Sequence, residues 1–150
     1  MGNAAKDGGA AVRPARILVV DDDPALRELI LCTLERRGFS AEGAADGIEA
    51  LIHLERSHFD VVITDLQMPR LDGLGLVHEI RRMESPPPVV VQSAVLDAPL
   101  ELVLRRAGAF RVLTKGKSLK ELGDTVTEAC RLVRGFPTSN AYAPDENTRI

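Results

Sequence analysis

The chain has 150 residues, the length of one ordinary domain that can bury a full hydrophobic core. Its formal net charge of −3 and its pI near 5.6 argue against nucleic-acid binding, which usually needs a basic surface. No apolar stretch approaches the ~20 residues that span a bilayer, and the N-terminus has no apolar signal core, so the sequence predicts a cytoplasmic protein without a membrane-binding segment.

Three segments differ in composition. Residues 1–14 are rich in glycine and alanine, which predicts a disordered extension. Residues 135–150 lose hydrophobic periodicity and gain turn-forming residues, so we expect a tail or the start of a linker there. The body between them, residues 15–134, has the normal size of a single domain.

The body alternates between apolar strands and amphipathic helices. The run ARILVV predicts a buried strand, and Asp23 followed by Pro24 is typical of a helix start, with the aspartate as N-cap. The expected strands, in chain order, are 15–20, 39–44, 60–64, 89–94 and 110–114. The expected helices that follow them are 24–37, 46–57, 73–84, 98–107 and 118–134.

Five strand–helix units with near-continuous apolar strands predict an α/β fold, in which helices cover both faces of a parallel sheet. Right-handed crossovers leave few topologies. The commonest for this order of elements is the (βα)5 flavodoxin-like, doubly wound sheet with strand order 2-1-3-4-5. In such folds ligands bind at the carboxyl ends of the strands, near the switch point between the first and third strands.

Polar residues stand at those ends: Asp21 and Asp22 after the first strand, Asp65 after the third, Ser93 at the fourth and Lys115 after the fifth. Each has an ordinary interpretation as a loop acid, a strand-end hydroxyl or a solvated charge. Two carboxylates about 4 Å apart, however, repel by about 4 kcal/mol at an effective dielectric near 20, so three together should take up a proton or a cation. Oxygen ligands without cysteine or histidine favour Mg²⁺ or Mn²⁺.

These groups together have a chemical use that none has alone. A carboxylate nucleophile, a bound cation, a lysine and a hydroxyl are the parts needed to transfer and hold a phosphoryl group. Positioning and charge neutralisation do most of the work in such reactions.

With these residues the chain resembles the receiver domain of bacterial two-component response regulators over about residues 15–134. The resemblance rests on the segments LVVDDDP, DVVITDLQMPRLDG, VVVQSA and GAFRVLTKG, in the family's order and at compatible spacing. It implies a phosphorelay signalling module and not a turnover enzyme. Asp65 would accept a phosphoryl group from a histidine kinase or a histidine phosphotransfer protein.

The resemblance also implies the remaining roles. The Mg²⁺ ligands it implies are Asp21, Asp22, Asp65 and the backbone carbonyl of Gln67. Ser93 and Lys115 would bind the phosphoryl oxygens, and Ala94 is the small residue beside the acceptor. A stand-alone, chemotaxis-regulator-like protein would act on a downstream protein through the face of its fourth helix, fifth strand and fifth helix. Nothing after residue 134 could form a helix-turn-helix, so we expect no nucleic-acid partner.

Three positions depart from the family pattern. Gly116 follows Lys115 where the family usually has proline, so we expect a looser loop and a less firmly placed lysine. Val112 stands where an aromatic residue is common, so an inward-swinging ring is unavailable as a switch. Gln92 places an amide in an otherwise apolar strand, where it either finds hydrogen-bond partners in the interior or marks a partly exposed strand end.

Other functions remain open. The departures at Gly116 and Val112 favour a degenerate receiver that serves as a phosphorylation-independent interaction module. An enzyme of the haloacid-dehalogenase type also uses an aspartyl phosphate and Mg²⁺, but it needs an Asp-x-Asp arrangement on the first strand, whereas the candidate here is Asp65 on the third. A dinucleotide-binding fold would need a Gly-rich turn after the first strand, which this sequence lacks.

The two cysteines carry little functional information. Cys32 and Cys130 both fall in helical apolar patterns, so we expect both to be small buried hydrophobes. Two cysteines and three scattered histidines make no metal-ligand pattern, and reduced cysteines suit a cytoplasmic protein.

Overall fold

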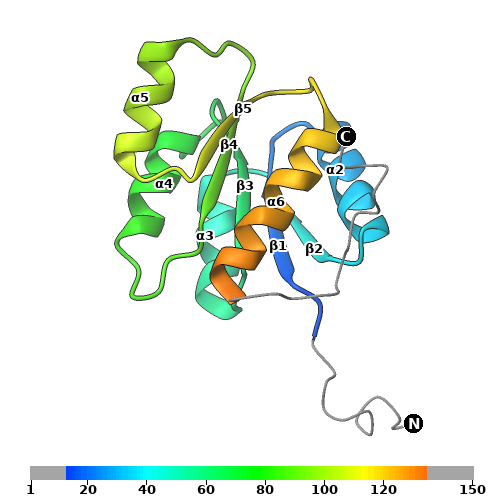
Figure 1. Ribbon diagram of the computed structural model, residues 1–150. Helices are drawn as coiled ribbons and strands as arrows, with labels where there is room; N and C mark the ends of the chain where they lie inside the picture. The colour runs from blue at the N-terminus through cyan, green and yellow to red at the C-terminus, as the bar shows by residue number, and fades with distance from the viewer. Residues whose placement is uncertain (1–12, 135–150) are drawn as a thin grey trace, which may run out of the picture.

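The computed structural model describes residues 13–134, so the extensions predicted at 1–14 and 135–150 lie outside it except for residues 13 and 14. Five parallel strands form one sheet in the order β2-β1-β3-β4-β5, with helices on both faces (Figure 1). The strands are β1 (Arg16–Val20), β2 (Ser40–Ala44), β3 (Val61–Asp65), β4 (Val89–Ser93) and β5 (Arg111–Thr114). The helices are α2 (Pro24–Arg36), α3 (Gly47–Arg56), α4 (Gly73–Arg81), α5 (Ala98–Ala107) and α6 (Leu119–Arg134). The predicted flavodoxin-like topology is confirmed.

The element bounds differ from the prediction mainly at α4. This helix ends at Arg81 and not at residue 84. The N–H groups of Arg82 and Met83 bond to carbonyls three residues earlier, at 3.2 and 2.9 Å, which tightens the last turn before the three prolines at 86–88. Strand β3 extends through Asp65, one residue beyond the predicted end. The pairing with β4 continues to this point, because the N–H of Leu66 donates to the carbonyl of Gln92 at 2.9 Å.

The sheet has a hydrophobic core on each face. Along β1, Ile17 and Val19 pack with α2 and α6, whereas Leu18 and Val20 pack with α3, α4 and α5. These two groups of helices lie on opposite sides of the sheet in Figure 1. Every residue of the central strands β3 and β4 is buried, as a parallel strand covered on both faces requires.

Strand register sets which side chains stand next to one another. Asp65 of β3 pairs with Gln92 of β4, and Gln92 pairs with Leu113 of β5. Leu113 belongs to the core under α2 and α6. Because register partners in a parallel sheet share a face, Asp65 and Gln92 also point toward that side.

The cysteines differ from each other. Cys130 is buried on α6, as predicted, but the prediction for Cys32 is wrong, since it is exposed on α2. The buried residues of α2 are Ile30 and Leu34. Cys32 is two positions from either, which is about 200° around the helix, and it therefore faces outward. No helix within residues 13–134 combines the length and apolar character needed to cross a bilayer.

Candidate functional site

Three carboxylates meet at the carboxyl edge of the sheet. Asp21 and Asp22 follow β1 and Asp65 ends β3, and these two strands are neighbours. Each residue offers an oxygen that lies within 4.8 Å of the other two. Asp21 and Asp65 are buried, whereas Asp22 is exposed. The acids that sequence reasoning predicted to converge are therefore brought together, with one open side.

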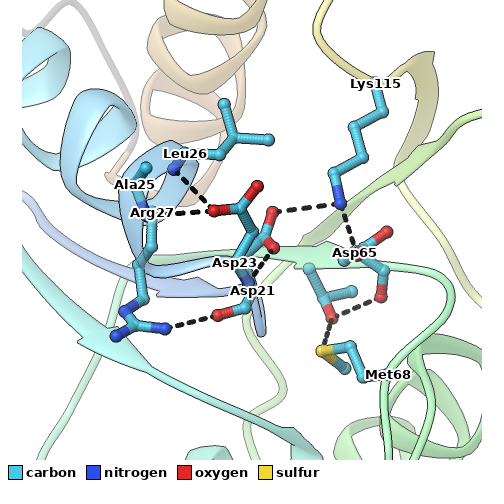
Figure 2. A network of polar contacts seen from close by, with 9 residues as sticks. Asp21, Asp23, Ala25, Leu26, Arg27, Asp65, Met68 and Lys115 are labelled. Carbon is cyan, nitrogen blue, oxygen red and sulfur yellow. Dashed lines mark hydrogen bonds and ion pairs between the residues drawn. The ribbon is translucent and has the colours of Figure 1, made fainter.

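Asp21 is the most constrained of the three. Its Oδ1 accepts a hydrogen bond from the N–H of Asp23 at 2.9 Å, and its backbone carbonyl accepts one from Nη1 of Arg27 at 2.6 Å (Figure 2). Asp23 in turn caps α2, as predicted, by accepting from the N–H groups of Ala25 and Leu26. Arg27 was missed in the sequence, because an arginine on the first turns of a helix carries no signal of its own.

The second oxygen of Asp21 lacks a hydrogen bond. Oδ2 is buried without such a partner among the described residues, although Nζ of Lys115 lies 3.5 Å away. Burial, and to a smaller extent the charge of Asp65, raise the pKa of Asp21 against the opposing effects of Lys115 and the Asp23 N–H. A buried carboxylate oxygen without a donor is costly. A hard divalent cation would satisfy it, so the donor set fits Mg²⁺.

Lys115 neutralises part of this charge. Its Nζ lies 2.6 Å from Oδ2 of Asp65, and Figure 2 shows the side chain reaching across to both Asp65 and Asp21. Burial opposes the charged ammonium, but the hydrogen bond to Asp65 and the field of both carboxylates outweigh it and raise the pKa of Lys115. Its backbone N–H donates to the carbonyl of Ser93 at 2.8 Å. The lysine is thus held at two points, even though glycine follows it.

Ser93 and Gln67 flank the acids differently. Ser93 ends β4 and is buried, and its hydroxyl donates to the carbonyl of Val95 at 2.6 Å. The hydroxyl is therefore engaged within its own loop and does not bond to Asp65. Gln67 is exposed in the loop after β3, two residues beyond Asp65.

A second feature missed in the sequence is an ion pair that anchors this loop. Arg70 donates from Nε and Nη2 to Oδ2 of Asp46, at 2.9 and 2.5 Å. Asp46 caps α3 through the N–H of Glu49. Burial alone would raise the pKa of Asp46, but the Glu49 N–H and the Arg70 guanidinium outweigh it and hold that pKa below its usual value. The loop that carries Gln67 is thereby fastened to α3.

The structure also describes the three positions that depart from the family pattern. Gly116 has φ +71°, a left-handed conformation that proline cannot adopt, and a Cβ placed there would meet no atom within 4 Å. Val112 is buried in the core under α3, α4 and α5. Gln92 is buried, being 5% exposed, so it does not mark an exposed strand end.

Comparison with known proteins gives a consistent result. Residues 17–127 match the family model of the response regulator receiver domain. The chain is 35% identical over 137 residues to the transcriptional regulatory protein GlrR of Escherichia coli (strain K12), covering 91% of this chain and 29% of that protein. It spans about half the length of other curated relatives that it matches.

Solved structures agree with this match. The Francisella response regulator 1452 receiver domain is similar with a TM-score of 0.76 and 30% identity, covering 79% of this chain and 98% of that chain. The response regulator protein TrrA of Thermotoga maritima, in complex with Mg²⁺-BeF, has a TM-score of 0.69 and 32% identity, covering 77% and 98%.

Proposed function

The chain belongs to the response regulator receiver domain family, and we propose that it is a phosphorylation-dependent module of a two-component phosphorelay, with Asp65 as the phosphoryl acceptor. Receiver domains are signalling modules and not turnover enzymes on external substrates. The observation that carries the proposal is the contact of 2.6 Å between Nζ of Lys115 and Oδ2 of Asp65, inside a cluster of three carboxylates.

In the proposed reaction Asp65 is the nucleophile. One carboxylate oxygen forms a bond to phosphorus while the phosphorus–nitrogen bond of a phosphohistidine breaks, and the electron pair of that bond returns to the imidazole nitrogen. The phosphohistidine would belong to a histidine kinase or a histidine phosphotransfer protein. Lys115 lies where it can neutralise the charge that gathers on the transferred oxygens.

Mg²⁺ is the proposed cofactor of this site. Asp21, Asp22, Asp65 and the backbone carbonyl of Gln67 would hold it, and the buried Oδ2 of Asp21 supports that assignment. A bound Mg²⁺ supplies Lewis-acid stabilisation of phosphoryl oxygens.

Ser93 is the proposed switch hydroxyl. To bond a phosphoryl oxygen it must give up its 2.6 Å hydrogen bond to the carbonyl of Val95, so phosphorylation would release the loop after β4. A downstream protein would read that change on the face of α5, β5 and α6, where Leu102 and Val103 of α5 are exposed. We place this activity in residues 15–134 of a cytoplasmic protein.

The direct test is Mg²⁺-dependent uptake of a phosphoryl group from acetyl phosphate. The wild type should take up about one equivalent, and Asp65→Asn should take up none while keeping its circular dichroism spectrum. Asp97→Asn is the matched control, since Asp97 caps α5 through the N–H of Leu100 and asparagine caps equally well. Wild-type protein that stays unlabelled with Mg²⁺ present would refute the proposal.

The alternative is a degenerate receiver that binds its partner without phosphorylation. Gly116 in a left-handed conformation and the missing aromatic at Val112 favour it. It predicts one and the same partner affinity for the wild type, Asp65→Asn and phosphorylated protein, measured by calorimetry. The proposed function predicts that phosphorylation changes that affinity.

A further inference from the structure

Gln92 is a buried residue whose amide the functions assigned above leave unexplained. It lies in β4 with 5% of its surface exposed, where the three residues before it, Val89, Val90 and Val91, are all buried and apolar. Its backbone carbonyl accepts the N–H of Leu66 at 2.9 Å. Its side-chain amide makes no hydrogen bond within residues 13–134.

The Gln92 amide has no hydrogen-bonding role within the described fold. Among the described residues the buried polar atom without a hydrogen bond is Oδ2 of Asp21 and not an atom of the Gln92 amide, so the amide keeps contact with solvent at this edge of the sheet. An apolar side chain could fill the same position, as valine does at the three preceding positions. Gln92 therefore contributes nothing to this state of the protein that would explain an amide, which points to a partner that is present in another state.

Strand register shows where such a partner would be. Gln92 stands directly beside Asp65 on the same face of the sheet. Neighbouring strands are about 4.8 Å apart, so the two side chains leave adjacent backbone positions on that face. Asp21 lies one residue beyond the last β1–β3 pair, on the same face, and Lys115 follows Leu113 by two residues. The amide thus lies in a row of groups that converge on Asp65.

We propose that Gln92 is a further phosphoryl-binding residue, which donates a hydrogen bond from Nε2 to an oxygen of the group carried by Asp65. Without that group, Oδ2 of Asp65 is directed to Lys115, and the amide is left without a partner. A phosphoryl group adds three acceptor oxygens beyond the carboxylate. The inference rests on the proposed function and adds a donor to Lys115 and Ser93.

The test compares the wild type with Gln92→Met, which keeps the length of the side chain and removes the amide. The probe is beryllofluoride in the presence of Mg²⁺, titrated by calorimetry. The dissociation constant should rise about tenfold, the factor expected when one hydrogen bond to a charged group is lost. Without beryllofluoride, the melting temperature of Gln92→Met should equal that of the wild type, because the amide makes no hydrogen bond within the described residues.

A dissociation constant that rises while the melting temperature stays the same separates ligand binding from packing. Thr127→Val is the matched control: Thr127 is buried on α6, and its hydroxyl donates to the carbonyl of Gly123 at 2.9 Å, so its loss should lower the melting temperature and leave the dissociation constant unchanged. Gln92→Glu, which removes the donor and adds a negative charge, should weaken beryllofluoride binding further. It replaces Gln92→Met if that variant fails to fold.

Two results would overturn the inference. One is an unchanged dissociation constant in Gln92→Met, which would mean that the amide does not touch the ligand. The other is a fall in melting temperature together with weaker binding, which would assign Gln92 a packing role. Wild-type protein that does not bind beryllofluoride would instead remove the proposed function, and this inference with it.

Discussion

Replacing Asp21 with asparagine should stabilise the protein without metal and weaken its response to Mg²⁺. Asp21 is 1% exposed, and its Oδ2 lacks a hydrogen bond. Asparagine has nearly the same shape but no charge. The variant therefore removes a buried charge while it preserves packing.

Opposing interactions set the size of the effect. Lys115, 3.5 Å from Oδ2, attracts the Asp21 carboxylate by about 5 kcal/mol at an effective dielectric of 20. Asp65, within 4.8 Å, repels it by about 3.5 kcal/mol on the same basis, and the exposed Asp22 adds about 1 kcal/mol at the dielectric of water. These nearly cancel. What remains is the cost of burying an oxygen without a donor, about 1–2 kcal/mol, which asparagine recovers.

Thermal unfolding in EDTA and in Mg²⁺ measures both effects. In EDTA at pH 7, Asp21→Asn should melt about 4–8 °C above the wild type. Added Mg²⁺ should raise the melting temperature of the wild type but that of the variant much less, since a ligand is lost. Asp60→Asn is the matched control. Asp60 is also buried but accepts from the N–H of Arg16 at 2.8 Å and lies 3.1 Å from His58, so its loss should destabilise the protein.

The pH dependence gives a second check on the same variant. Burial raises the pKa of Asp21 above its usual 3.8, so the folded state binds its proton more tightly than the unfolded state does. The stability that this proton contributes is present below pH 3.8 and is lost as pH rises through the higher, folded pKa. The advantage of Asp21→Asn should therefore appear at neutral pH and vanish in acid. A variant that melts below the wild type in EDTA at pH 7 would refute the reasoning.

Three further predictions concern the loops and the thiols. Arg70 is the one non-glycine residue within 13–134 with positive φ, at 69°. Arg70→Ala and Arg70→Gly both lose the pair with Asp46, but in urea unfolding the alanine variant should have a free energy of unfolding about 1 kcal/mol below that of the glycine variant. Equal urea midpoints for the two variants would contradict a strained backbone at residue 70. Gly116→Ala should cost about 1 kcal/mol through its φ of +71° alone, and Gly116→Pro clearly more; a Gly116→Pro protein as stable as the wild type would show that this loop refolds around proline. A thiol reagent at pH 8 should label Cys32 quickly and Cys130 only after unfolding, since burial raises the pKa of Cys130 to about 12. Equal labelling rates, read by mass spectrometry, would contradict the burial of Cys130.

The sequence predicted the sheet and the meeting of acids for one physical reason. Apolar runs such as DVVIT predict parallel strands, and parallel strands end at the same edge, so the sequence alone predicts that Asp21, Asp65 and Lys115 lie together. To predict that these side chains converge, only the strand order was needed, and the preference for right-handed crossovers leaves few possible orders.

Other features depended on details that residue patterns do not carry. The pair between Arg70 and Asp46 needs a left-handed residue in a loop and a contact across 24 positions, and neither follows from periodicity. Cys32 was wrongly predicted to be buried. Many residues of this helix are apolar, so the sequence does not show which apolar residues belong to the buried stripe. The lack of a partner for the Gln92 amide is a property of three-dimensional packing, so the sequence could only raise the question.

One contact at the opposite edge of the sheet bears on how this domain can be joined to others. Nη2 of Arg134, the last residue of α6, donates to the carbonyl of Arg13 at 2.7 Å, so the two ends of the described fold lie side by side, away from the carboxyl edge (Figure 1). Folds with adjacent ends tolerate insertion into a host loop and circular permutation. This domain could therefore be inserted into a loop of an unrelated protein. Both junctions would lie at one corner of the domain, and the acid cluster would remain exposed at the opposite edge.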